Sequence, residues 1–284
     1  MKQQPVNDRI QRKSPQWRVS QRWAVGIAQV LRGLTGGFTF RKTLPREFGG
    51  AKIMVTSRSD IRLLAPGFSS SAGDLLQIAR LCIRSGDCVW DLGSNLGIFA
   101  CCAAWKAGPN GRVFSLEADP FYAELQHRTV KTLPEGYAPV VPLCAAVADK
   151  MTILDLAVPK RGHSRSHLKT VAGNDPGETE TIKQVVSVTC DFLVEHWGRP
   201  DFVKVDIEGA ELLFLSGARK LLETMRPTFY IEVSERNRDD VTKILRSQDY
   251  VLSRFSLSGE EIPLRGCEFN TVAKPAEKQG LNFL

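Results

Sequence analysis

From Cys88 onward the sequence alternates short apolar runs with amphipathic segments, and this alternation restricts the fold more than any other feature. The expected strands are 88–92, 112–116, 140–147, 185–189, 202–206, 228–233, 250–255 and one around 268–272. The expected helices are 97–106, 120–132, 191–196, 210–224 and 238–248. Repeated strand–helix units require a mostly parallel sheet with helices on both faces, so we predict an α/β, doubly wound fold.

Three further segments lie outside this alternation. Residues 51–64 are expected to form a hairpin that turns at 58–60, and residues 72–84 a helix. Residues 151–158 alternate like a strand added antiparallel to the sheet. The polar stretch 159–181 contains His163 and His167, and loops of that length in a compact domain are usually functional or disordered.

The net charge of +7 is concentrated at the N-terminus. Residues 1–50 hold ten Lys and Arg against two acids, a balance of +8 that leaves −1 for the rest of the chain. We predict that 1–50 is a basic, partly disordered extension with a short amphipathic helix, and that 51–284 is the catalytic domain. The helix either packs on its own domain or makes peripheral contact with an anionic membrane through residues 17–35.

Neither composition nor cysteine spacing points to a membrane-spanning or zinc protein. No window approaches the roughly 18 uninterrupted apolar residues that a transmembrane helix needs, so we expect a soluble, cytoplasmic chain. The seven cysteines form no CxxC pair and their number is odd, which favours free thiols and no bound metal.

The first motif is the glycine-rich turn Asp91-Leu-Gly-Ser-Asn-Leu-Gly97, which follows an expected strand and opens a helix. Gly93 and Gly97 let the backbone approach a ligand closely. A dinucleotide site would show GxGxxG matched to a pyrophosphate. Asp91 would repel a pyrophosphate but suits a sulfonium or ammonium group, so the turn favours S-adenosylmethionine (SAM) over NAD.

Other polar or small residues follow the next strand ends, where ligands bind on such sheets. Glu117 closes the second strand and offers a bidentate acceptor for two ribose hydroxyls. The small residues of 145–149, Ala146 among them, offer an adenine ring a flat wall, with Asp149 as an acceptor for its amine. Asp206 and Glu208 stand together at a later strand end.

Together these stretches resemble the FkbM family of SAM-dependent methyltransferases, a branch of the seven-stranded class I fold. The resemblance rests on Val89-Trp-Asp-Leu-Gly-Ser-Asn-Leu-Gly97, Ser115-Leu-Glu-Ala-Asp-Pro120, Val188-Thr-Cys-Asp-Phe-Leu193, Phe202-Val-Lys-Val-Asp-Ile-Glu-Gly-Ala-Glu211 with Leu215-Ser-Gly-Ala218, and Arg226-Pro-Thr-Phe-Tyr-Ile-Glu-Val233. The family pattern often has Glu-Pro after the second strand, where this chain has Glu117-Ala-Asp-Pro120.

The resemblance implies O-methylation of a hydroxyl on a sugar, glycan or secondary metabolite. It implies that the turn holds the methionine part of SAM, that Glu117 holds the ribose, and that Asp206 and Glu208 line the methyl-transfer site. The expected cofactor-binding residues are Asp91, Gly93, Ser94, Asn95, Gly97, Glu117, Ala118, Ala146 and Asp206.

Methyl transfer to oxygen needs a base for the hydroxyl proton. Glu208 and Asp206 are the first candidates, because a partly buried carboxylate has a raised pKa. His163 is the next, with His167 one helical turn further on. A Mg²⁺ ion on Asp206 and Glu208 is an alternative, but the sequence shows no third carboxylate placed to complete its site.

Two other functions compete with this hypothesis. A nucleic-acid methyltransferase would use the basic extension as a backbone-binding arm, but the chain lacks an Asn/Asp-Pro-Pro-aromatic element, so we expect no nucleic-acid partner. A catalytically inactive SAM-binding partner protein is disfavoured because Asp91, Glu117 and Asp206 are all present. The acceptor and the oligomeric state stay open.

Overall fold

A computed structural model describes residues 38–64, 66–68, 72–159, 166–169 and 179–278. The predicted amphipathic helix of the N-terminal extension and the candidate base His163 lie outside these residues.

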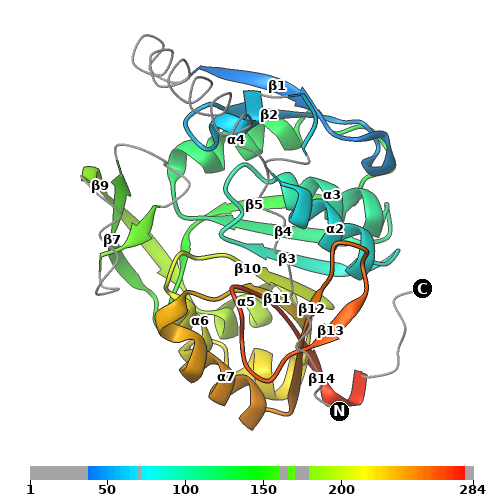
Figure 1. Cartoon of the computed structure of the whole chain (residues 1–284). Coiled ribbons are helices and arrows are strands. Elements are labelled where there is room, and N and C mark those ends of the chain that lie inside the picture. The colour runs from blue at the N-terminus through cyan, green and yellow to red at the C-terminus, as the bar shows by residue number, and fades with distance from the viewer. Residues whose placement is uncertain (1–37, 65, 69–71, 160–165, 170–178, 279–284) are drawn as a thin grey trace, which may run out of the picture. The chain divides into compact units, whose positions relative to one another are not determined.

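A central sheet organises the fold and confirms the predicted α/β, doubly wound architecture (Figure 1). Its order is β13-β12-β14-β11-β10-β3-β4-β5. The strands are β3 (Cys88–Leu92), β4 (Arg112–Glu117), β5 (Val140–Cys144), β10 (Phe202–Val205), β11 (Thr228–Glu232), β12 (Tyr250–Phe255), β13 (Glu261–Pro263) and β14 (Asn270–Pro275). The strands from β11 to β5 are parallel, whereas β14 is antiparallel to both of its neighbours. The short β13 is an eighth strand, added antiparallel to β12.

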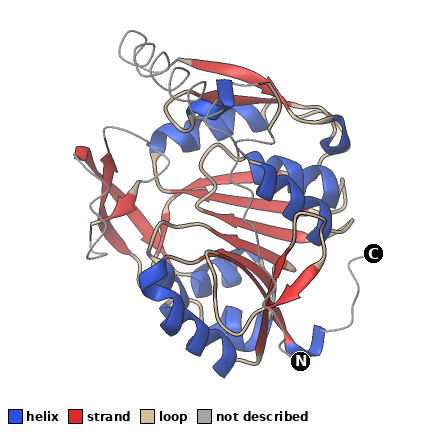
Figure 2. Ribbon diagram, in the orientation of Figure 1, coloured by secondary structure: helices blue, strands red, loops and turns tan. Residues whose placement is uncertain are grey.

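Helices cover both faces of this sheet (Figure 2). One face packs against α2 (Gly73–Cys82), α3 (Ile98–Ala107) and α4 (Pro120–Val130), and the other against α5 (Cys190–Trp197), α6 (Glu211–Ser216) and α7 (Arg238–Ser247). Alternate strand residues enter the two cores, as the period of two requires: Val89 faces the first and Trp90 the second. None of the described helices is long and apolar enough to cross a membrane.

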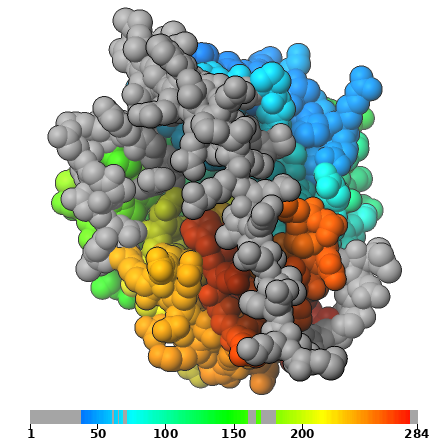
Figure 3. Space-filling view, viewed as in Figure 1, coloured from blue at the N-terminus to red at the C-terminus, as the bar shows by residue number. Residues whose placement is uncertain are grey.

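The strand order reverses between β3 and β10, because the chain builds β3, β4 and β5 outward on one side and then returns to place β10 on the other. The carboxyl ends of these two strands therefore form the crevice where such sheets bind ligands. The turn between β12 and β13 packs on α2, where Gln77 Nε2 donates to the Ser256 carbonyl oxygen at 2.8 Å. In Figure 3 the orange atoms of this C-terminal part of the chain accordingly lie beside cyan atoms.

The expected hairpin at 51–64 is wrong. The strand β2 (Lys52–Thr56) pairs antiparallel with the earlier strand β1 (Thr39–Thr43), and the residues after it form the 3₁₀ turn η2 (Ile61–Leu64). The connection from β1 to β2 contains the 3₁₀ turn η1 (Arg46–Phe48) and two glycines with positive φ, Gly49 and Gly50. The chain therefore reverses direction in the connection before β2, and not after β2 as the expected hairpin required.

The expected strand at 185–189 does not join the central sheet. It is the end of β9 (Thr179–Val188), which belongs to a side sheet in the order β6-β9-β7-β8. The other strands of this side sheet are β6 (Ala146–Val147), β7 (Thr152–Pro159) and β8 (His167–Leu168). β9 pairs antiparallel with β7 along its length. The antiparallel strand expected at 151–158 is therefore confirmed as β7, which belongs to the side sheet.

The expected helix at 210–224 is also interrupted. α6 ends at Ser216, and a π-helical turn, η4 (Leu221–Met225), follows. Gly217 caps the end of α6, and a Cβ atom there would lie 2.3 Å from the Ala148 carbonyl oxygen, so only glycine fits at this position.

Candidate active site

The glycine-rich turn between β3 and α3 is locked onto its neighbouring strands. Gly93 has φ +75°, and a Cβ atom there would lie 1.8 Å from the Asp206 carbonyl oxygen, so only glycine fits. The Gly93 and Ser94 amides both donate to the Leu116 carbonyl oxygen, at 3.0 and 2.9 Å. Gly97 caps α3 with φ +72°. The turn therefore bridges the carboxyl ends of β10 and β4.

Gln126 on α4 anchors the turn from behind, and sequence reasoning missed it. Its buried side-chain amide donates to Ser94 Oγ at 2.8 Å and to the Asn95 carbonyl oxygen at 2.5 Å. Its Oε1 atom accepts from Ser115 Oγ at 2.6 Å. A glutamine inside an amphipathic helix carries no local signal of this role, because its partners come from two other segments.

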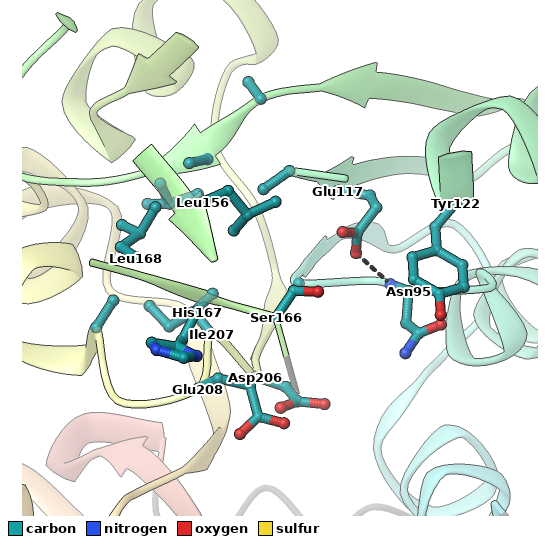
Figure 4. A pocket seen from close by; sticks show the side chains of 16 residues that line it. Asn95, Glu117, Tyr122, Leu156, Ser166, His167, Leu168, Asp206, Ile207 and Glu208 are labelled. Atoms are coloured by element: carbon teal, nitrogen blue, oxygen red, sulfur yellow. Dashed lines mark hydrogen bonds between the residues drawn. The ribbon is translucent and has the colours of Figure 1, made fainter. Parts of the chain in front are cut away.

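Glu117 is oriented by two backbone amides. The Asn95 amide donates to Oε2 at 2.7 Å (Figure 4), and the Asp119 amide donates to Oε1 at 2.8 Å. Each carboxylate oxygen keeps a further lone pair, so the group can accept one hydrogen bond on each oxygen from a vicinal diol. Burial raises the pKa of Glu117 to about 7, although both backbone hydrogen bonds oppose the shift.

A cavity opens beside Glu117, which we call the nucleoside cavity (Figure 4). Its lining residues come from the turn, from the ends of β4 and β10, and from the side sheet: Gly93, Asn95, Glu117, Ala118, Tyr122, Ala145, Ala146, Val147, Leu156, Ser166, His167, Leu168, Asp206, Ile207, Glu208 and Ala210. The predicted residues Ala118 and Ala146 thus line the wall with apolar side chains. Asp149 is exposed and does not line this cavity.

A second cavity of about 360 Å³, which we call the acidic cavity, is also lined by residues of the turn. It is lined by Ser59, Asp60, Arg62, Leu63, Ala72, Gly73, Asp74, Leu75, Gly93, Ser94, Asn95, Leu96, Ile98, Phe99, Lys204, Asp206, Glu208 and Glu232. Four residues line both cavities: Gly93, Asn95, Asp206 and Glu208. These four therefore form the junction between the two spaces.

Two carboxylates of the acidic cavity, Glu232 and Asp74, were missed from the sequence. The pairing of Val205 with Ile231 places Glu232 beside Asp206 at adjacent strand ends. Burial, followed by the charge of Asp206, raises the pKa of Glu232 to about 8, and Lys204 opposes the shift. The signal was available, because Glu232 is the next-to-last residue of the strand expected at 228–233.

Asp91 lies behind the site and lines neither cavity. Its side chain is fully buried, and Oδ1 lies 3.3 Å from Lys204 Nζ. Lys204 Nζ also lies 3.3 Å from Asp206 Oδ2 and donates to the Gly93 carbonyl oxygen at 3.2 Å. Burial alone would lower the pKa of Lys204, but the carboxylates of Asp91 and Asp206 raise it above its ordinary value. In this structure Asp91 contacts Lys204 and supports the turn; its role as a direct SAM ligand stays a prediction.

The turn after β10 holds its carboxylates in an unusual backbone conformation. Glu208 has φ +48° and Gly209 has φ +91°. The buried Glu211 accepts hydrogen bonds from the Gly209 and Ser234 amides, both at 3.1 Å, and so supports this conformation. A non-glycine residue in the left-handed region costs free energy and persists where its surroundings hold it, often at a functional site.

The remaining expected residues lie in different places. Ser94 lines the acidic cavity, and Gly97 lines neither. His167 is buried on β8 and lines the nucleoside cavity but not the acidic one. All seven cysteines are free thiols, as expected. Within the described residues, no group of three or more His, Cys, Asp or Glu is arranged to hold a metal ion.

The chain is similar to several known proteins. Among solved structures, a precorrin-6y C5,15-methyltransferase from Geobacter metallireducens is 12% identical (TM-score 0.40), covering 70% of this chain and 86% of its own. A fibrillarin from Aeropyrum pernix, solved with natively bound SAM, is 13% identical (TM-score 0.40), covering 72% of this chain and 73% of its own.

In sequence, the chain is 27% identical over 183 residues to the hexuronic acid methyltransferase AglP of Haloferax volcanii, covering 59% of this chain and 70% of AglP. The family profile described as the methyltransferase FkbM domain matches residues 91–252, which is more than half of the 284-residue chain. That span includes the glycine-rich turn and the ends of β10 and β11, where Asp206 and Glu232 lie. The chain therefore belongs to the FkbM family of methyltransferases.

Proposed function

We propose that this methyltransferase uses SAM to methylate a hydroxyl group of a sugar, glycan or secondary metabolite. The observation that carries the proposal is the junction of two cavities at Gly93, Asn95, Asp206 and Glu208, with Glu117 on one side and further carboxylates on the other. The name of AglP, a hexuronic acid methyltransferase, supports a sugar acceptor.

The nucleoside cavity has the chemistry that an adenosine group needs. Glu117 has one acceptor position on each oxygen for the two ribose hydroxyls. Ala118 and Ala146, with Leu156 and Leu168 from the side sheet, offer an adenine ring apolar walls. Gly93 removes the side chain that would otherwise fill the junction. The residues present therefore fit SAM, which supplies an electrophilic methyl group when bound.

Transfer to oxygen is an in-line displacement, so the protein must hold the acceptor at the junction and take up its proton. Glu208 is our first candidate for the base because it lines both cavities. Asp206 also lines both, but its Oδ2 atom is already engaged by Lys204 Nζ at 3.3 Å. We assign Asp206 to positioning and Glu208 to proton transfer.

Cofactor binding is tested by calorimetry with SAM and S-adenosylhomocysteine. Glu117→Gln is expected to weaken both, whereas Glu124→Gln, which changes an exposed acid on the following helix α4, is the matched control and leaves them unchanged. Equal cofactor affinity in the wild type and in Glu117→Gln would show that Glu117 does not contribute to cofactor binding.

Catalysis is tested with methyl-labelled SAM and a panel of glycosides. Glu208→Gln is expected to abolish transfer to a hydroxyl while leaving SAM affinity intact. Undiminished transfer in this variant would rule out Glu208 as the base. Label recovered in RNA rather than in any hydroxyl compound would favour the nucleic-acid alternative.

A further inference from the structure

We infer that Tyr122 is a further cofactor-binding residue, whose hydroxyl donates a hydrogen bond to a ribose hydroxyl that itself donates to Glu117. The enzyme thereby selects an intact ribose and discriminates against deoxyadenosyl compounds. This assignment deepens the proposed function and rests on it, because it takes the nucleoside cavity as the site of the adenosine group. Tyr122 lies on α4, outside the glycine-rich turn and the strand ends.

The Tyr122 side chain is buried, but its hydroxyl lacks a partner. The residue is 2% exposed and packs in the core beneath α2, α3 and α4. No described residue meets its Oη atom with hydrogen-bond geometry. A buried polar group that is left unpaired costs free energy, and most such groups in native proteins are paired. The Tyr122 hydroxyl therefore calls for a partner from outside the described chain.

This hydroxyl also keeps a proton to donate. Burial, followed by the charges of Asp119 and Glu117, raises the pKa of the Tyr122 phenol. The nearby Ser59 hydroxyl opposes this shift only in part, and its own proton is donated to Asn95 Oδ1 at 3.0 Å. The phenol therefore stays neutral near physiological pH and acts as a donor.

The position of Tyr122 favours the nucleoside over the acceptor. Tyr122 lines the nucleoside cavity and does not line the acidic cavity. Figure 4 shows Leu156 and Leu168 on one side of Glu117 and the Tyr122 ring on the other, beside Asn95. The leucines are the apolar walls proposed for adenine, so Tyr122 lies toward the ribose end of the cavity.

A short series of contacts holds Tyr122 and Glu117 in one arrangement. The Asp119 amide donates to Glu117 Oε1 at 2.8 Å. The Asp119 side chain accepts from the Phe121 amide at 2.9 Å and caps α4, and Lys183 Nζ from β9 contacts the same carboxylate at 2.6 Å. Tyr122 stands in the first turn of this capped helix, so its side chain is placed together with the Glu117 carboxylate.

A ribose hydroxyl has the chemistry to join these two groups. A hydroxyl donates one hydrogen bond and accepts up to two. Its proton goes to a Glu117 oxygen, each of which keeps a further lone pair, and its own oxygen accepts from Tyr122. Hydrogen bonds in such a chain polarise one another. A deoxy position has only C–H bonds and leaves both protein groups unpaired.

The test compares the wild type with Tyr122→Phe, which removes only the hydroxyl. Calorimetry uses S-adenosylhomocysteine and its 2′-deoxy and 3′-deoxy forms. Tyr122→Phe is expected to bind S-adenosylhomocysteine about three- to tenfold more weakly than the wild type. For the analogue that lacks the contacted hydroxyl, the two proteins are expected to agree within about twofold. Equal affinity for S-adenosylhomocysteine overturns the inference, and so does an equal loss for all three ligands.

Tyr250→Phe is the matched control. Tyr250 is also 2% exposed, its hydroxyl also lacks a partner among the described residues, and it lines neither cavity. This variant is expected to keep all three affinities.

Thermal unfolding without ligand separates binding from a structural role. Both variants are expected to stay within about 2 °C of the wild-type Tm, because neither loses a hydrogen bond within the described chain. A larger fall in Tyr122→Phe would show that the hydroxyl is bonded within the fold and contradicts the inference. Failure of S-adenosylhomocysteine to bind the wild type overturns the proposed function as well, whereas normal binding with no change in Tyr122→Phe overturns the role of Tyr122 alone.

Discussion

Acidification from about pH 7 to about pH 5.5 is expected to weaken SAM binding by protonating Glu117. The ionised carboxylate accepts a hydrogen bond on each oxygen, and the neutral acid loses one of these acceptors. Burial raises the pKa of Glu117 to about 7, so the binding-competent form dominates above that value and is lost below it. The ionised fraction falls from about one half to about 3% over this range, which limits the loss to about 15-fold, or about 1.6 kcal/mol.

The assay is calorimetric titration of SAM at several pH values within this range. Glu232, whose pKa is raised to about 8, stays mostly protonated throughout and contributes little to the slope. Glu117→Gln is expected to bind weakly with no slope over the same range. A flat profile in wild type, or a slope that survives in Glu117→Gln, would refute the proposed contact with ribose.

Three substitutions test the framework around the turn. Gly93→Ala is expected to weaken SAM binding at least about 100-fold in calorimetry, because its Cβ atom would lie 1.8 Å from the Asp206 carbonyl oxygen; near-normal affinity would contradict this. Lys204→Met leaves Asp91 and Asp206 without their buried partner, so urea denaturation is expected to show a loss of about 3–5 kcal/mol, and a loss under about 1 kcal/mol would count against the buried ion pair. Gln126→Leu removes the hydrogen bonds to Ser94 and Asn95, and the SAM Kd is expected to rise about tenfold; an unchanged Kd would show that the turn holds without them.

Residues in contiguous motifs were largely predictable. Gly93, Asn95 and Glu117 were expected from the turn and the next strand end, and all three line a cavity. Each follows a strand of a parallel sheet, so the rule that ligands bind at the carboxyl ends of strands places it without tertiary information.

Residues whose role depends on distant partners were not predictable. Gln126 acts through three hydrogen bonds to other segments, and nothing local marks it. The binding of SAM by Asp91 stays a prediction, but its buried ion pair with Lys204 could not be predicted, because that partner comes from the neighbouring strand.

The incorrect strand predictions have the same cause. Apolar alternation marks a strand without specifying its partner, so β2 was paired with the residues after it instead of with β1. β9 was likewise assigned to the central sheet, although pairing with β7 places it in the side sheet.

The contact of Gly93 with Asp206 also limits how such an enzyme can diverge. The glycine-rich turn rests directly on the backbone that carries the junction carboxylates, so a shift of that backbone to suit a new acceptor would also move the turn. Asp74 and Glu232 are not part of this contact, and their side chains can change while the junction keeps its geometry. New acceptor preferences are therefore expected to arise through changes at Asp74 and Glu232, while the residues that line both cavities stay constant.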